Sequence, residues 1–408
     1  CPTYLETGLE PESPRGRIYL IKAASQGRIP ITANVIRHLD LCLQCRNCES
    51  ACPSGVPYGR IMEQTRATII QNGQAPLSWL GRMLVLRHLI AHPGRLRLAM
   101  YPLQLYNQLG LPRLVERAQC VGFLPRKLYH LATLAPRPAR RIALTPGTVM
   151  HPPSGMAQRR VGVLVGCVMP WLYDRVNVAT ARVLARNGCE VVAPAGQVCC
   201  GALHAHNGDR VAARRLARRN IDAFLAAGVD AIVVNSAGCG SAMKEYAELL
   251  HSDRRYAERA RCFSAMVRDV SEFLAELPFE KPTGVVSGTV TYQDSCHLAH
   301  AQRIAAPPRA ILNAIPGLRL VEMEHADLCC GSAGIYSVTQ GEMSGQLLRR
   351  KMREVAQTGA QIIATANPGC MMQLETGLRR YSLAGQVAHV VELLDQSYRA
   401  GEGNAHQS

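Results

Sequence analysis

Residues 42–53 read Cys-Leu-Gln-Cys-Arg-Asn-Cys-Glu-Ser-Ala-Cys-Pro, a C-x₂-C-x₂-C-x₃-C-P run. This spacing is typical of thiolates bound to [4Fe–4S] clusters. The first three cysteines bind one cluster, and the cysteine before proline binds a second cluster. A zinc site more often presents two separated C-x₂-C pairs. The run therefore predicts single-electron chemistry. No nucleophile–base pair stands out elsewhere, so no catalytic residue is predicted.

The chain begins with Cys1-Pro2, and a Cys-Pro pair is also how the run at 42–53 ends. Where two such runs occur, the last cysteine of each run binds the cluster of the other. We therefore expect one complete cluster with four ligands: Cys1, Cys42, Cys45 and Cys48. Cys52 is expected to bind a second cluster whose other ligands precede the first residue. The alternative is that Cys1 is an ordinary terminal residue.

The composition indicates a large, helix-rich protein of a reducing compartment. The chain has 408 residues, of which 48% are hydrophobic and 5% aromatic, which predicts two or three domains. Sixteen cysteines in so long a chain, several of them in C-x₂-C or Cys-Cys-Gly runs, favour metal thiolates over disulfides. With no signal peptide and no apolar stretch long enough to span a membrane, we expect a cytoplasmic protein.

The net charge of +16 is concentrated in residues 81–160, which hold thirteen Lys or Arg and one acid, Glu116. Leucines and tyrosines are interleaved with these cations, and a basic amphipathic segment of this kind can lie on an anionic membrane surface. Peripheral contact with the inner face of the cell membrane is therefore one expectation. A solvated face, or a docking surface for an acidic partner subunit, is the alternative. No nucleic-acid recognition fold is apparent, so we expect no nucleic acid partner.

The second half of the chain contains two copies of one cysteine pattern, in which a single cysteine is followed by a Cys-Cys-Gly triplet and another single cysteine. The first copy comprises Cys167, Cys199, Cys200 and Cys239. The second copy comprises Cys296, Cys329, Cys330 and Cys370. The offsets between matching cysteines are 129, 130 and 131 residues. Recurrence at so constant an offset predicts an internal duplication.

Short apolar runs precede the single cysteines of both copies. These runs, which we expect to be strands, are 161–166, 231–235, 290–292 and 362–365. Helical patterns lie between them, for example over 210–227 and 343–356, and this alternation predicts parallel sheets. Sites in such sheets lie beyond the carboxyl ends of the strands, so each cysteine set is expected to converge on one site. The glycine after each Cys-Cys pair permits the turn that would aim both thiols at one centre.

Each set offers four thiols, enough for one iron–sulfur centre, although buried cysteines that merely pack are the alternative. Four thiols are one short of a C…CC…C-x-x-C set, since Ala242 and Gln373 occupy the last position. Cysteines outside these patterns are expected to be buried thiols: Cys120, Cys189 and Cys262. Nearby histidines, expected to be ligands, proton relays or ordinary turn residues, are His204, His206, His297, His300 and His325.

Several stretches together resemble the iron–sulfur subunit of glycolate oxidase (glycolate dehydrogenase) over nearly the whole chain. They are Cys1-Pro-Thr-Tyr4, Ser13-Pro-Arg-Gly-Arg-Ile-Tyr-Leu-Ile-Lys22, residues 38–49, Cys52-Pro-Ser-Gly55, Gly238-Cys-Gly240 with Lys244-Glu-Tyr246, and Leu328-Cys-Cys-Gly-Ser-Ala-Gly334. The run at 42–53 alone would occur in many ferredoxins. The stretch at 13–22 followed by two Cys-Cys-Gly repeats is much more specific.

The resemblance implies a helical ferredoxin-like domain followed by two α/β cysteine-rich domains like those of heterodisulfide reductase. It implies an oxidoreductase complex in which an FAD subunit oxidises glycolate to glyoxylate, assisted by a second flavoprotein-like subunit. The FAD lies only on the partner, and this chain relays electrons to a respiratory-chain acceptor other than NAD or O₂. It also implies [4Fe–4S] clusters on Cys1, Cys42, Cys45 and Cys48 and on Cys52, with a further iron–sulfur centre at the Cys-Cys-Gly sites as an expectation.

The predicted organisation has four parts: residues 1–75, a ferredoxin-type domain; 76–158, a basic helical linker; 159–282, the first Cys-Cys-Gly domain; and 283–408, the second. Two other functions stay open. One is the equivalent subunit of a lactate or glycerol-3-phosphate dehydrogenase complex. The other is a thiol–disulfide oxidoreductase like heterodisulfide reductase. A redox-silent zinc scaffold is a third, structural alternative.

Overall fold

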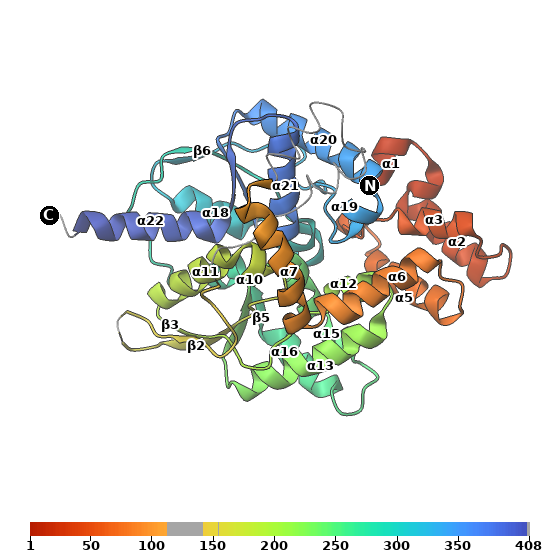
Figure 1. Cartoon of the computed structure of the whole chain (residues 1–408), viewed down its shortest axis with the longest axis horizontal. Helices are drawn as coiled ribbons and strands as arrows, with labels where there is room; N and C mark the ends of the chain where they lie inside the picture. Colours follow the sequence, from red (N-terminus) through yellow and green to blue (C-terminus); the bar gives the residue numbers. More distant parts are fainter. Residues whose placement is uncertain (112–141, 154, 406–408) are drawn as a thin grey trace.

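The N-terminal part of the chain is a group of short helices, in red and orange at the right of Figure 1. The computed structural model describes residues 1–111, 142–153 and 155–405. The helices before residue 72 are α1 (Pro2–Thr7), η1 (Glu10–Glu12), α2 (Pro14–Ser25), α3 (Ala33–Asp40), α4 (Asn47–Ser50) and α5 (Tyr58–Gln71). Ser13 and Thr32 begin α2 and α3, because each side-chain oxygen accepts a backbone N–H of the first helical turn.

A second helical segment leads from this group towards the rest of the molecule. It consists of α6 (Leu77–Val85), the π-helical η2 (Leu86–Ile90) and α7 (Pro93–Gln108). Arg87 of η2 forms an ion pair with Asp209, at 2.5 Å, and so fixes the segment to the first repeat. Among the described residues, no helix is both long and apolar enough to span a bilayer. Cys120 and the basic residues at 112–141 lie outside the described residues.

The first repeat is a five-stranded sheet in the order β1-β3-β2-β4-β5. Its strands are β1 (Val149–Met150), β2 (Arg159–Val163), β3 (Cys189–Val192), β4 (Ala231–Val234) and β5 (Val267–Asp269). All its pairings are parallel except that of the edge strand β1 with β3. Its helices are α10 (Met169–Leu172), α11 (Asp174–Arg186), α12 (Ala202–His206), α13 (Arg210–Ala226), α14 (Ala237–Lys244), α15 (Tyr246–Leu249), α16 (Ala257–Met266) and α17 (Val270–Ala275).

The second repeat is a fully parallel four-stranded sheet in the order β7-β6-β8-β9. Its strands are β6 (Gly288–Tyr292), β7 (Leu318–Leu320), β8 (Ile362–Thr365) and β9 (Gln386–His389). Its helices are η3 (His297–Ala301), α18 (Ala306–Ala314), α19 (Tyr336–Thr339), α20 (Gly341–Thr358), α21 (Pro368–Arg380) and α22 (Val390–Ala405). Apart from β1, the strands follow the same order in both sheets, so the predicted duplication is confirmed as a structural repeat.

The two repeats share one hydrophobic core. A single buried cluster contains residues of both sheets, including Val161 and Val163 of β2 and Val290 of β6. Helix α11 of the first repeat packs along α22 of the second. Arg182 of α11 also pairs with Asp395 of α22, at 2.5 Å. The two repeats therefore pack as one body rather than as two independent domains.

The predicted parallel sheets are confirmed, with two differences. The strand expected over 161–166 is found over Arg159–Val163, and Gly166 then turns the chain through a left-handed conformation (φ 82°) towards Cys167. The short strand β1 falls inside the segment expected to be a linker, because it pairs with β3 of the first sheet. The boundaries between the four predicted parts stay a prediction.

The expectation of a buried thiol at Cys262 is wrong. Cys262 is exposed because it lies on the solvent side of α16, whereas Ala260 and Phe263 of that helix face the core. Cys189 in β3 is buried, as expected.

Candidate functional site

Four cysteines from the N-terminal helices line one small cavity: Cys1, Cys42, Cys45 and Cys48. Cys1 stands at the N-terminus of α1, Cys48 lies on α4, and the other two lie in the loop before α4. That loop folds back because Gln44 and Arg46 adopt left-handed backbone conformations (φ 53° and 61°). The space left among these side chains is small, about 20 Å³. The sequence spacing and the tertiary fold thus bring the same four thiols together.

Hydrogen-bond donors point at these sulfurs. The Cys42 Sγ accepts the Gln44 backbone N–H at 3.3 Å and the Tyr58 hydroxyl at 3.6 Å. The Cys1 Sγ lies 4.0 Å from Nη1 of Arg17. Such donors stabilise negative charge on sulfur, whether on a thiolate or on a cluster. Without a metal, burial raises the pKa of Cys48 to about 12, so a bound metal would have to displace protons from the thiols.

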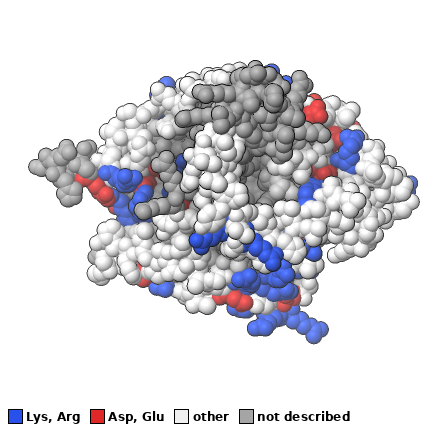
Figure 2. All heavy atoms as spheres, in the orientation of Figure 1, with Lys and Arg blue, Asp and Glu red and all other residues white. Residues whose placement is uncertain are grey.

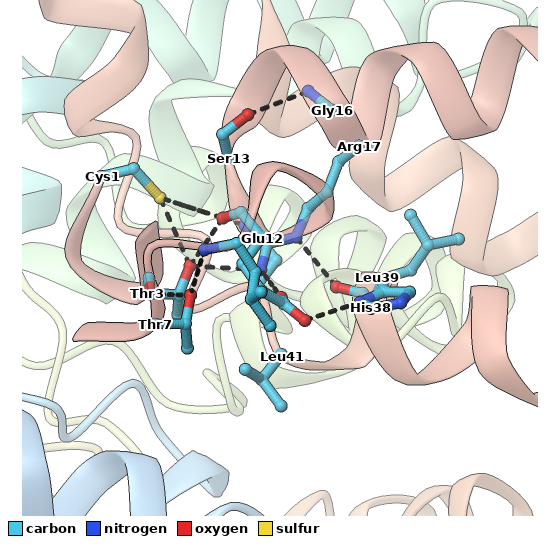
Figure 3. A network of polar contacts seen from close by, with 12 residues as sticks. Cys1, Thr3, Thr7, Glu12, Ser13, Gly16, Arg17, His38, Leu39 and Leu41 are labelled. Atoms are coloured by element: carbon cyan, nitrogen blue, oxygen red, sulfur yellow. Dashed lines mark hydrogen bonds and ion pairs between the residues drawn. The ribbon is translucent and has the colours of Figure 1, made fainter. Parts of the chain in front are cut away.

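A buried ionic network holds Cys1 in place (Figure 3). Arg17 on α2 is 1% exposed and pairs with Glu12 at 2.6 Å. Glu12 also bonds Nδ1 of His38 at 2.6 Å, and Arg17 donates to Thr3 at 3.1 Å. The α2 helix approaches η1 closely because Gly16 has no side chain. A Cβ atom at this position would lie 2.0 Å from the Glu10 carbonyl oxygen. The network therefore ties the chain's first residues to α3, directly before the cysteine loop.

Cys52 is not among the residues that line this cavity. Its pKa is lowered by backbone N–H groups, foremost that of Val56. Cys52 thus lies outside the lining of this cavity, and its role as ligand of a second cluster stays a prediction.

Each Cys-Cys-Gly set is a chain of four thiols in contact. In the first set the contacts run from Cys167 to Cys199, Cys200 and Cys239. In the second they run from Cys296 to Cys329, Cys330 and Cys370. Gly201 and Gly331 follow the Cys-Cys pairs with φ of 85° and 88°, which confirms the predicted turns. Both sets lie in loops and helix starts beyond strand ends, and binding of each set to one centre stays a prediction.

The cavity cysteines and the second set meet in the interior. Cys45 and Cys329 belong to one buried cluster with Leu43, Tyr336 and Leu347. The Tyr336 hydroxyl donates to the Leu41 carbonyl at 3.0 Å, which closes this contact. The N-terminal loop therefore places the Cys45 thiol next to the second repeat rather than at the molecular surface.

Two histidines join the N-terminal loop to both repeats. The rings of His206 and His297 meet edge to face with centroids 5.0 Å apart. His297 Nε2 bonds the Gln44 carbonyl at 3.0 Å, and the Gln44 amide donates to the His206 carbonyl at 2.8 Å. Burial lowers the pKa of His297 to about 3, so that ring is neutral. These two histidines hold the N-terminal cysteine loop against both repeats. The sequence did not reveal this role.

The other candidate histidines have separate surroundings. His300 bonds Ser50 at 3.0 Å and so contacts the end of α4, and His325 is exposed in a left-handed turn (φ 54°). His204 is fully buried beside Cys199. Sequence reasoning named the histidines but missed Arg17, Glu12 and Tyr58. The only signal for Arg17 was its place in the specific stretch at 13–22.

The four thiols around the cavity suit an iron–sulfur cluster. A cubane spreads four thiolates over four irons, which matches thiols placed around a cavity with donors aimed at sulfur.

Comparison with known proteins agrees with this geometry. Residues 1–56 match the 4Fe-4S dicluster domain, 79–135 match the linker region of the glycolate oxidase iron-sulfur subunit, and 161–244 and 290–375 match the cysteine-rich domain. The chain is 40% identical to the probable glycolate oxidase iron-sulfur subunit of Bacillus subtilis, over 97% of this chain and 90% of that protein. The chain belongs to the glycolate oxidase iron–sulfur subunit family.

Other relatives place this family among redox subunits. The glycolate oxidase iron-sulfur subunit of Escherichia coli is 36% identical over 97% of this chain and 91% of its own. One subunit of the fumarate reductase (CoM/CoB) from Methanothermobacter marburgensis is 34% identical over 59% of this chain and 46% of its own. As a member of the glycolate oxidase iron–sulfur subunit family, this chain is an electron-transfer subunit that carries iron–sulfur clusters and belongs to an oxidoreductase complex.

Proposed function

We propose that this chain passes electrons from a flavoprotein subunit that oxidises glycolate to an acceptor of the respiratory chain. A bound [4Fe–4S] cluster supplies one-electron transfer. In this proposal Cys1, Cys42, Cys45 and Cys48 ligate one cluster and Cys52 ligates another. The observation that carries the proposal is the convergence of the four thiols on a cavity beside the second Cys-Cys-Gly set. Tyr58 and the Gln44 N–H stabilise charge on sulfur, and Arg17 supplies a fixed positive charge.

The partners follow from the family. The names of the relatives support an FAD-containing glycolate oxidase subunit as the electron donor. A second flavoprotein-like subunit is part of the same proposal, as is an acceptor other than NAD or O₂. The lactate and glycerol-3-phosphate alternatives would use the same cysteines with another flavoprotein.

The test is anaerobic purification of the protein with the flavoprotein that it retains, followed by addition of glycolate, D-lactate or glycerol 3-phosphate. Rapid bleaching of the visible iron–sulfur absorbance by glycolate alone would support the proposal. Bleaching by D-lactate or glycerol 3-phosphate instead would assign the chain to a lactate or glycerol-3-phosphate dehydrogenase complex. If dithionite reduces the clusters but none of the three donors bleaches them, the partner assignment is wrong. The thiol–disulfide oxidoreductase alternative is then favoured. Cys45→Ser should lose the cluster signal, and Cys262→Ser, an exposed thiol outside every set, should not.

We also propose a cytoplasmic location with contact to an anionic membrane surface through α6 and α7. Exposed apolar side chains of these helices support this contact: Leu77, Leu84, Val85, Leu98, Tyr101, Leu105 and Leu109. Cations gather beside them. Desolvation and the nearby Arg95, Arg215 and Arg219 lower the pKa of His92. Figure 2 shows Lys and Arg clustered in the lower part of the molecule, over α13.

Flotation with vesicles tests this contact. The protein should float with vesicles containing phosphatidylserine and not with pure phosphatidylcholine vesicles, and high salt should weaken binding. Leu98→Ser with Leu105→Ser should reduce flotation. Val338→Ser, which changes an apolar residue 61% exposed on another helix, should not. Equal flotation of all three proteins, or none with anionic lipid, would refute the contact.

A further inference from the structure

The first Cys-Cys-Gly set contains a buried imidazole whose polar neighbour is a thiol. His204 on α12 is 0% exposed. Neither its Nδ1 nor its Nε2 has an oxygen or nitrogen hydrogen-bond partner among the described residues, and the ring interacts with the Cys199 thiol. Leaving a buried polar group unpaired is costly, so native structures seldom keep one without a use. Even with the Cys199 thiol as one partner, the ring keeps a buried nitrogen that a group outside the polypeptide could bind.

The local fold places this ring at the thiols. Gly201 turns the chain after the Cys-Cys pair and is directly followed by α12. His204 is the third residue of that helix, and its ring lies beside the Cys199 thiol. Cys199 is in turn in contact with Cys167 and Cys200. The imidazole is thus a fifth donor beside a set of four thiols.

The donor set points to a multi-iron centre. Imidazole and thiolate both bind iron and zinc, but structural zinc is almost always four-coordinate, and this site offers five donors. An iron–sulfur centre has several irons and takes histidine in place of cysteine at some sites. Here Ala242 stands where a fifth cysteine would stand in a C…CC…C-x-x-C set. His204 would supply the donor that Ala242 does not.

The second set differs at this position. The residue that matches His204, 130 positions later, is Gly334. A side chain there would lie 2.4 Å from Cδ2 of Leu203, so the space is already filled by the first repeat. We propose that His204 is a protein ligand of an iron–sulfur centre held by Cys167, Cys199, Cys200 and Cys239, and that the second set has no histidine ligand. This proposal does not depend on which donor reduces the protein.

Pulsed EPR of the full-length protein, purified anaerobically from cells grown with ¹⁵N-histidine, tests the ligand. A histidine nitrogen bound to iron should give a strong hyperfine coupling that changes between ¹⁴N and ¹⁵N samples. His204→Ala should abolish this coupling. His204→Cys should abolish it too while restoring a fifth thiolate, so the iron content should stay at the wild-type level even if the alanine variant folds poorly.

The control is His389→Gln. His389 is also fully buried, but Nε2 is 3.0 Å from the Asn235 carbonyl and Nδ1 accepts the Val391 N–H, so it should leave the coupling intact. A coupling that survives in both His204 variants would assign another histidine and refute the proposal. The proposal would also be refuted if the cavity cysteines and Cys52 accounted for all the iron. It would equally be refuted if elemental analysis found zinc in the wild type and Cys199→Ser removed that zinc.

Discussion

Single side chains around the cavity set its electrostatics. Arg17 brings a positive charge into a site where cysteines must bind as thiolates, and Glu12 neutralises it at 2.6 Å. A buried pair of this kind is costly to break, since removing one partner leaves the other charge desolvated. The spacing of the cysteines was readable from the sequence. The pairing of residues 12, 17 and 38 was not, because it joins three elements that no local pattern connects.

Arg17→Met is expected to lower the free energy of unfolding by up to about 3–5 kcal/mol, because the buried Glu12 loses its guanidinium partner and keeps only His38. The measurement is thermal unfolding of the anaerobically purified protein together with its iron content. The double variant Arg17→Met/Glu12→Gln should recover most of the loss. Equal destabilisation in the single and double variants would mean that packing, rather than charge, is what Arg17 supplies.

Tyr58→Phe is expected to lower the reduction potential of the cluster at Cys42. The hydroxyl donates to the Cys42 Sγ at 3.6 Å, and such a bond stabilises the more negative, reduced state. A loss of about 1 kcal/mol corresponds to about 40 mV for one electron. An EPR-monitored redox titration measures the shift. Tyr256→Phe, whose hydroxyl bonds Asp222 far from the thiols, should leave the potential unchanged.

At the scale of elements, the strand–turn–helix unit positions each thiol set. A strand ends, a short loop carries the cysteines, and a helix begins. The Cys-Cys-Gly turn was predictable, because glycine adopts the left-handed conformation without strain. The sequence already placed His204 of α12 near the first set, but its complete burial was not predictable, because burial depends on tertiary packing.

Gly331→Ala is expected to destabilise the protein by about 1–3 kcal/mol. Its φ is 88°, and an added Cβ would lie 2.8 Å from the Ser344 carbonyl oxygen. The melting temperature is the readout. Gly81→Ala, inside α6 with nothing within 4 Å of the new methyl group, should instead be neutral or stabilise by up to about 1 kcal/mol. A tolerated Gly331→Ala would show that the loop can relax.

At the scale of the whole molecule, the two repeats and the N-terminal helices form one body. His389 at the end of β9 bonds the Asn235 carbonyl just beyond β4 at 3.0 Å, so a buried histidine joins one sheet to the other. The Ala237 N–H donates to the Ala366 carbonyl at 3.1 Å close by. Because of this contact, protonation chemistry at one residue is coupled to the stability of the whole fold.

Stability should fall as the pH drops below about 6.5. Burial lowers the pKa of His389 to about 4, from 6.5 when exposed. Between these values the unfolded chain binds a proton that the native chain does not, so acid favours unfolding. The full contribution of His389 to the free energy of unfolding is about 3 kcal/mol, of which about 2 kcal/mol is lost between pH 6.5 and 5. Chemical unfolding at several pH values measures it.

His389→Gln keeps a donor for the Asn235 carbonyl but cannot titrate, so the loss of stability between pH 6.5 and 5 should shrink by about 2 kcal/mol. His251→Gln, which changes an exposed histidine, should follow the wild type. An unchanged slope in the His389 variant would mean that other groups carry the acid sensitivity.

The sequence by itself determined the chemistry and the architecture of this protein. Ligand spacing is a local property, and duplication and strand–helix alternation are periodic ones, so cluster type, repeats and parallel sheets could all be read from the order of residues. Tertiary structure alone decided that Cys45 lies beside Cys329, that Arg17 is buried next to Cys1, and that His204 faces the first thiol set. These relations depend on packing between segments up to hundreds of residues apart, and burial is what gives their charges and donors their strength.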